Sequence, residues 1–207
     1  MPTRPLSVRE ADGRPPTAAE LARRREILDA TIAVIGRGGW AACTLQAVAA
    51  EVGVTKAAVI YHVGTKAALV ERAYAFVIEA FTQFVQERVE ASTDPLDAVT
   101  EFALAHLDYM REHRDHARLI AESLHDAHGS GIDDRPTTPA RAEPAIALIE
   151  AARTAGNGRA RHPEDARAIA TVVGGMIDSA VAAWLIDPDF DLEAAKRLIA
   201  LHIVTTV

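Results

Sequence analysis

The sequence is poor in cysteine and in aromatic residues. Cys43 is the only cysteine among 207 residues, which excludes an intramolecular disulfide framework and a zinc site built from several cysteines. Aromatic residues make up 5% of the chain although hydrophobic residues make up 49%, so the predicted core is aliphatic. Alanine-rich stretches that contain valine and few aromatics favour closely packed helices over a β-sandwich.

Long apolar runs and export signals are also lacking. We expect no run to reach the ~20 residues that cross a bilayer, and the first sixteen residues hold no apolar signal-peptide core. A cytoplasmic protein without a membrane partner is therefore expected. The sequence contains no strand alternation, nucleophile elbow, phosphate loop or HExxH motif, so neither an enzyme nor a bound cofactor is predicted.

Charge is distributed unevenly along the chain. The net charge at pH 7 is −7, from 22 Lys and Arg against 29 Asp and Glu. Residues 1–66 hold nine basic and six acidic residues and carry +3, whereas residues 67–207 hold thirteen and twenty-three and carry −10. A basic N-terminal third on an acidic remainder is expected when one end of a protein meets a polyanion.

Apolar periodicity and capping residues predict an all-α fold of about nine helices. Residues 1–16 are rich in Pro and Arg and are interpreted as a flexible arm. A first helix opens at Thr17, which forms a capping-box pattern with Glu20, and is expected to stop within the glycine-rich residues 36–39. Later helices are predicted over residues 45–52, 56–63, 66–91, 95–112, 115–128, 140–155, 163–186 and 192–207, with a loop over 129–139.

Residues 44–62 carry the most informative pattern. Two short predicted helices are joined by a turn that begins with glycine, as in a helix-turn-helix. A small residue at Ala49 lets the helices cross closely, and Gly53 lets the backbone turn. An ordinary alanine-rich helical hairpin has the same spacing, so the spacing alone leaves both interpretations open. In the first interpretation the second helix exposes Lys56, Ala57, Ile60, Tyr61 and His62.

The continuation of this pattern is more specific. Tyr61 and His62 are followed in register by Gly64–Thr65–Lys66, and the stretch GWAACTLQAVAAEVGVTKAAVIYHVGTKAALV resembles the DNA-binding signature of the tetracycline-repressor (TetR) family of bacterial regulators. Val63 departs from the resemblance, because most relatives carry Phe there. The resemblance covers residues 20–70, and the remainder resembles the family only in length and number of helices.

The resemblance implies a helix-turn-helix DNA-binding domain over residues 17–65 and a ligand-binding and dimerisation domain over residues 66–207. Thr44 and Lys66 would bind DNA phosphates, and the arginines of the N-terminal arm could enter a minor groove. The short second helix would enter a major groove. The residues expected at DNA are Thr44, Gln46, Thr55, Lys56, Ala57, Ile60, Tyr61, His62 and Lys66.

The acidic domain is expected to hold an effector pocket. We predict a mostly apolar cavity with few polar groups, lined by Phe81, Phe84, Phe102, His106, Tyr109 and Met176. A second interpretation is a metal or acidic-ligand site made from His106, His113, His116, Glu122, His125 and His128. Residues spaced by three drift around a helix and need not converge, so no metal is predicted.

The two predicted C-terminal helices carry more apolar surface than one protomer is expected to cover. The helix 163–186 is apolar almost all round, and the last helix is rich in Leu and Ile. Pairing both with their symmetry mates would form a four-helix bundle, although burial within one protomer is the alternative.

These features together predict a sequence-specific transcriptional regulator. We expect a homodimeric repressor that a small, fairly hydrophobic ligand releases from a pseudo-palindromic double-stranded operator, with the long helix 66–91 as the lever. A DNA-binding regulator without a ligand is one alternative. A helical-bundle enzyme that uses the His and Glu residues of 106–128 is another.

Overall fold

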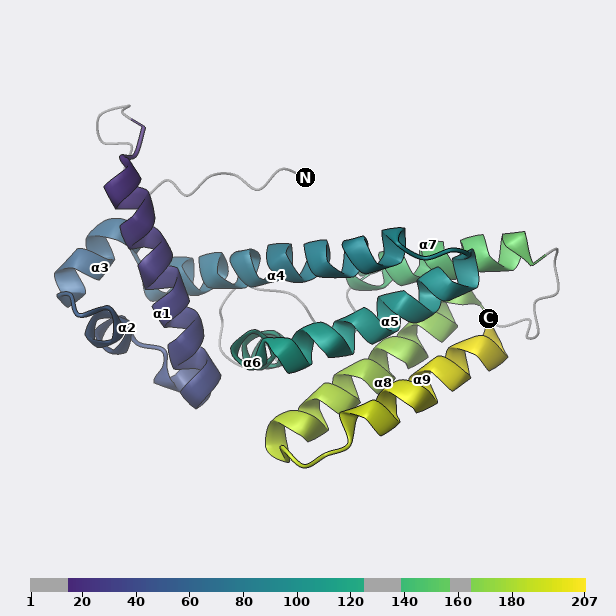
Figure 1. Cartoon of the computed structure of the whole chain (residues 1–207). Coiled ribbons are helices and arrows are strands. Elements are labelled where there is room, and N and C mark those ends of the chain that lie inside the picture. The colour runs from purple at the N-terminus through teal and green to yellow at the C-terminus, as the bar shows by residue number, and fades with distance from the viewer. Residues whose placement is uncertain (1–14, 125–138, 157–164) are drawn as a thin grey trace.

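The structure is a computed structural model that describes residues 15–124, 139–156 and 165–207. Within these ranges it contains helices, turns and no strand, in agreement with the all-α prediction (Figure 1). The nine helices are α1 (Ala18–Ala42), α2 (Leu45–Val52), α3 (Lys56–Val63), α4 (Lys66–Glu90), α5 (Pro95–Glu112), α6 (Arg114–Ser123), α7 (Pro139–Ala155), α8 (Ala166–Ile186) and α9 (Leu192–Thr206).

Several helix ends differ from the sequence prediction, and the ends of the first and sixth helices differ most. The first helix breaks at Gly39, within the predicted residues 36–39, but it resumes there and reaches Ala42. Helix α6 ends at Ser123, five residues before the predicted end, and no side-chain cap is present at its start. Residues 1–14, 125–138 and 157–164, which include most of the predicted arm and most of the predicted loop, lie outside the described residues.

The helices form two groups joined by one long helix. Helices α1, α2 and α3 gather at one end, and α4 runs from them along the other helices (Figure 1). Helix α5 lies at the centre of the second group, where it contacts α4, α7, α8 and α9. Helix α6 packs against α1, so a second element besides α4 joins the two groups. We call residues 17–65 the head and residues 66–207 the body.

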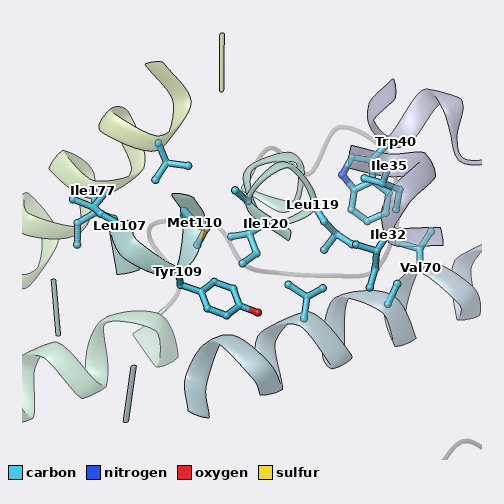
Figure 2. Close-up of a cluster of buried hydrophobic side chains, with 14 of the residues drawn as sticks. Ile32, Ile35, Trp40, Val70, Leu107, Tyr109, Met110, Leu119, Ile120 and Ile177 are labelled. Atoms are coloured by element: carbon cyan, nitrogen blue, oxygen red, sulfur yellow. The ribbon is translucent and has the colours of Figure 1, made fainter. Parts of the chain in front are cut away.

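The apolar core passes from the head into the body without interruption. Figure 2 shows Ile35 and Trp40 of α1 close to Leu119 of α6, and Tyr109 and other α5 side chains beyond them. Trp40 is 4% exposed, so it anchors the end of α1 as a core residue. Leu21, which lies near the start of α1, is 52% exposed and does not belong to this core.

Helix α8 corrects the expectation that no apolar run is long enough to cross a membrane. It has 21 residues, and an 18-residue window within it has a mean hydropathy of 1.8, which satisfies that test by length and composition. Helix α8 also packs against α5, α6, α7 and α9. A core helix of a helical protein has the same composition, but only 33% of the apolar window of α8 is buried within this protomer.

Candidate nucleic-acid interface

The turn between α2 and α3 has the conformation that the sequence predicts. Gly53 lies in the left-handed region, with φ 74° and ψ 33°, and its N–H donates to the carbonyls of Ala49 and Ala50. The backbone N–H of Val54 donates to the Ala49 carbonyl at 2.9 Å. A side chain at Gly53 would meet open space, so glycine is needed for its backbone conformation and not for room.

The two short helices are docked by small and branched side chains. Val48 and Ala49 of α2 and Val59 of α3 are fully buried. Val63, which stands where the resemblance expects Phe, is 1% exposed and ends α3 against the core. An apolar side chain of this size therefore fills the docking position, and the opposite side of α3 is left outside.

The outer side of α3 is unusually apolar for a solvent-facing surface. Ile60 is 44% exposed and Tyr61 is 70% exposed, and both follow the exposed Lys56 and Ala57. Exposed large apolar side chains next to a cation are a feature of binding surfaces. Four of the residues predicted at DNA thus share one exposed side of an eight-residue helix.

Threonines cap the three helices that begin at this surface. The hydroxyl oxygens of Thr44, Thr55 and Thr65 accept backbone N–H bonds at 3.0 to 3.1 Å and begin α2, α3 and α4. A hydroxyl that accepts in this way still has its own hydrogen to donate. Thr65 was not among the residues predicted at DNA, although its position before Lys66 repeats the arrangement of Thr55 before Lys56. Gln46 is exposed on the first turn of α2.

Lys66 has a partner within the protein. Its ammonium group donates to the carbonyl of Trp40 at 3.2 Å, so it joins the start of α4 to the end of α1. An ammonium group has three hydrogens, and this bond uses one of them. The predicted phosphate contact and the observed bond can therefore exist together.

His62 lies at the edge of the outer surface of α3. Its ring contacts the Tyr61 ring edge to face, with centroids 5.1 Å apart. Desolvation, followed by the guanidinium groups of Arg24 and Arg23, lowers the pKa of His62, so the imidazole is neutral at pH 7. The start of α1 thus places positive charge beside the end of α3.

In the body, five of the six residues predicted to line a ligand cavity form one aromatic cluster. The Phe81 ring lies 4.6 Å from the His106 ring and 5.3 Å from the Tyr109 ring, between centroids. Phe84 contacts Tyr109, and Phe102 contacts His106. Met176 of α8 is partly buried against the core and makes no ring contact of this kind. We call these five residues of α4 and α5 the aromatic cluster.

His106 is a neutral core histidine. Its Nδ1–H donates to the carbonyl of Phe102, one turn earlier in α5. Burial, with a smaller contribution from Arg141, lowers the pKa of His106 to about 4 against the opposing effect of the backbone bond. The ring therefore serves as a packed, uncharged side chain at pH 7.

One groove of the described structure lies beside the aromatic cluster rather than inside it. A groove of about 390 Å³ runs between α1 and the α4–α5 pair, and its walls include Phe84 and Tyr109. Phe81, Phe102, His106 and Met176 do not line it. The remaining groove walls are Arg25, Asp29, Phe76, Ala80, Gln83, Glu87, His113 and His116.

The histidines of the alternative metal interpretation do not converge in the part of the chain described here. His113 stacks on His116, whose Nδ1 is hydrogen bonded to the Tyr109 hydroxyl at 2.7 Å. His106 lies among the aromatic cluster, and Glu122 lies at the end of α1. No group of three or more potential metal ligands occurs among the residues searched, and His125 and His128 lie outside the described residues.

Comparison with known families identifies the head. Residues 27–73, from α1 to the first turns of α4, match the model of the bacterial regulatory proteins of the tetR family. The chain is a member of this family. The family and the fold are those of transcriptional regulators. No curated protein matches the chain.

Solved structures share the fold over most of this TetR-family protein. The regulator FadR from Bacillus subtilis, in complex with stearoyl-CoA, has a TM-score of 0.74 at 15% identity and covers 88% of this chain and 98% of its own. AibR, in complex with isovaleryl coenzyme A and operator DNA, has a TM-score of 0.71 at 20% identity, covering 89% and 100%. A TetR-like regulator from Rhodococcus sp. RHA1 has a TM-score of 0.71 at 18% identity, covering 92% and 97%.

Proposed function

We propose that this TetR-family protein is a homodimeric repressor that binds a pseudo-palindromic operator through α3. The outer surface of α3 carries the proposal, because Lys56, Ile60 and Tyr61 are exposed there while Val59 holds the helix in place. A lysine suits guanine, and an exposed apolar side chain suits a thymine methyl group. Thr44, Thr55 and Lys66 would position the head on phosphates.

The head and the body are proposed to be functional domains, with the boundary at residues 65 and 66. The head carries the HTH pair and the exposed α3 surface, whereas the body carries the aromatic cluster. The body has its own central helix in α5, around which α4, α7, α8 and α9 pack. A cytoplasmic location is part of the proposal, since DNA is the partner.

Dimerisation is proposed to occur through α8 and α9. These neighbouring helices expose Val172, Leu198, Leu201 and Val204 to between 43% and 63%, on helices whose other sides are buried in the body. Two protomers that pair these sides would bury this apolar surface in a four-helix arrangement. A dimer would place two copies of α3 on successive major grooves, about 34–36 Å apart.

A small ligand is proposed to release the operator. The groove beside the aromatic cluster is lined by α1 of the head as well as by α4 and α5, so a ligand that prefers another arrangement there would lower DNA affinity. Two of the similar proteins are in complex with acyl-coenzyme A thioesters. Acyl-coenzyme A thioesters of increasing chain length are therefore the first compounds to test, and a regulator that needs no ligand is the alternative.

Selection of bound sites from random duplex DNA tests the proposal. We expect an enriched sequence with two inverted half-sites. Replacing Ile60 by alanine should lower affinity about tenfold and relax the preference at one base of each half-site. Glu150→Ala changes an exposed residue of α7 and should change affinity less than about twofold, as expected for a surface site away from DNA and from α8 and α9. Recovery of no preferred sequence, or of one without inverted symmetry, would contradict the proposal.

A further inference from the structure

The end of α1 is bound by residues from both sides of the head–body junction. At Gly39 the helix breaks, with φ 68° and ψ −172°, and the freed N–H of Trp40 donates to Oε2 of Glu122 at 3.4 Å. The carbonyl of the same residue accepts the ammonium group of Lys66 at 3.2 Å and the N–H of Cys43 at 3.2 Å. Trp40 is thus held between the body helix α6 and the first residue of α4.

The fit between Glu122 and the break in α1 is close. A methyl group on Gly39 would lie 2.8 Å from Oε1 of Glu122, so the carboxylate occupies the space that a side chain there would take. The positive φ of Gly39 is a second reason for glycine at this position. The same Oε1 of Glu122 accepts Nε–H of Arg118 at 3.2 Å, one turn earlier in α6, which fixes the carboxylate.

Glu122 has no role in the DNA surface or in the aromatic cluster, yet it touches the residue that Lys66 binds. Trp40 is 4% exposed and packs in the core shared by the head and the body (Figure 2). Its indole Nε1 has no hydrogen-bond partner among the described atoms, so its backbone carries its polar contacts there. The position of the end of α1, and with it that of Lys66, therefore depends on a short series of backbone contacts.

We propose that Glu122 is a positioning residue for DNA binding. It holds the break of α1 at Trp40, and through the Trp40 carbonyl it sets the position of Lys66 at the predicted phosphate-binding end of α4. Because Glu122 belongs to α6 of the body, this contact fixes the orientation of the head relative to the body. The inference rests on the proposed function, in which Lys66 and α3 meet operator DNA.

Substitutions at Glu122 separate an acceptor role from a charge role. Glu122→Ala removes the acceptor of the Trp40 N–H, and we expect it to lower operator affinity roughly five- to tenfold. Glu122→Gln keeps an acceptor oxygen of the same reach and should restore affinity to within about twofold. Glu122→Asp keeps the charge but shortens the side chain, so it should behave like Glu122→Ala. Glu150→Ala removes an exposed glutamate of α7 and is the matched control.

Tryptophan fluorescence reports the contact without DNA. In a Trp184→Phe background Trp40 is the only tryptophan. Glu122→Ala and Glu122→Asp should shift its emission to longer wavelength and increase its quenching by acrylamide, whereas Glu122→Gln and Glu150→Ala should leave both unchanged. If Glu122→Ala does not fold, Glu122→Asp supplies the same comparison.

The outcomes decide separately on the two proposals. Unchanged emission and unchanged affinity in Glu122→Ala and Glu122→Asp would overturn the positioning role, as would equal losses in Glu122→Gln and Glu122→Ala. If the unsubstituted protein binds no duplex selectively, the proposed function fails. The Trp40 emission series still decides in that case whether Glu122 holds the end of α1.

Discussion

Helices begin differently in the two parts of the molecule. The N-caps of α1, α2, α3 and α4 are the threonines Thr17, Thr44, Thr55 and Thr65. The described side-chain caps of the later helices α5, α8 and α9 are the aspartates Asp94, Asp165 and Asp191. Both side chains satisfy free backbone N–H groups, but only aspartate adds a negative charge that offsets the positive end of the helix dipole.

The difference has a physical reason if the head meets a polyanion. Threonine caps stabilise helix starts and leave their partial positive charge for phosphate oxygens, whereas aspartate caps would repel phosphate at the same positions. The body, which carries the acidic excess, has no such restriction. Its charges are used in long-range ion pairs such as Lys196 to Asp108 at 2.7 Å, in which Asp108 is buried.

The largest effect is expected from a variant that disrupts the proposed pairing of the two bodies. Leu198→Asp combined with Leu201→Asp puts two charges on the exposed apolar side of α9, where the leucines are 63% and 60% exposed. A monomer binds only one half-site at a time, so operator affinity should fall about 100-fold. Light scattering with chromatography measures the mass, and a DNA titration measures the affinity. Leu21→Asp alters a leucine of the head and should leave the mass unchanged; a double variant that stays dimeric would contradict the pairing.

Acid should destabilise the body through His106. Its pKa is lowered from 6.5 to about 4 by burial, so between these pH values the unfolded chain binds a proton and the folded protein does not. The free energy of unfolding does not depend on this group above pH 6.5, the pKa of histidine in the unfolded chain. It falls as the pH drops from 6.5 to about 4, and it levels off below pH 4. The loss from this one group is about 3 kcal/mol.

Denaturant unfolding at several pH values isolates this contribution. His106→Asn keeps a donor for the Phe102 carbonyl but does not titrate. The difference in pH dependence between the two proteins belongs to His106, because the carboxylates are common to both. Parallel curves for the two proteins would show that the ring is accessible to protons.

The cap comparison itself is tested by exchanging threonine and aspartate. Thr44→Asp and Thr55→Asp retain a good N-cap, so the free energy of unfolding should change by less than about 1 kcal/mol. Each should nevertheless weaken operator binding about tenfold, because a negative charge faces phosphate. Thr44→Asn and Thr55→Asn supply neutral caps and should bind normally. Equal affinity of the Asp and Asn variants would mean that these helix starts do not face the DNA backbone.

The smallest expected effect is a pH dependence of DNA binding from His62. Its pKa is lowered in the free protein by desolvation and by Arg24 and Arg23, with Glu20 acting in the opposite direction. Nearby phosphates favour the imidazolium, so binding takes up a proton and affinity rises as pH falls through the pKa of the complex. We expect a gain of about threefold, measured by fluorescence anisotropy between neutral and mildly acidic pH. His62→Gln should abolish the gain, and a gain that persists would assign it to another group.

Much of the head could be predicted because its structure is encoded locally. Thr44 caps α2, Gly53 makes the turn and Thr55 caps α3, and the predicted ranges 45–52 and 56–63 agree with the structure. The aspartate before Pro95 marks the start of α5 in the same way. A cap acts within three or four residues, so the sequence around it is sufficient.

The break in α1 could not be predicted in the same way. A glycine-rich stretch indicates a helix end, yet α1 resumes for three residues after Gly39 because Glu122, 82 positions later, binds the N–H that the break releases. Likewise, the ring contacts among Phe81, His106 and Tyr109 depend on how α4 packs against α5. Periodicity indicates which side of each helix is buried but not which open space remains beside it.

The sequence by itself determined that this chain is helical, that its N-terminal third holds a capped helix-turn-helix, and that α3 exposes Lys56, Ala57, Ile60 and Tyr61, although His62, also expected there, is half-buried. Those properties follow from hydrogen bonds and turns that close within a few residues. The tertiary structure alone decided that Lys66 binds Trp40, that Glu122 meets the end of α1, and that the groove lies between α1 and the α4–α5 pair. These contacts join residues far apart in the chain, and only the packing of helices against one another brings them together.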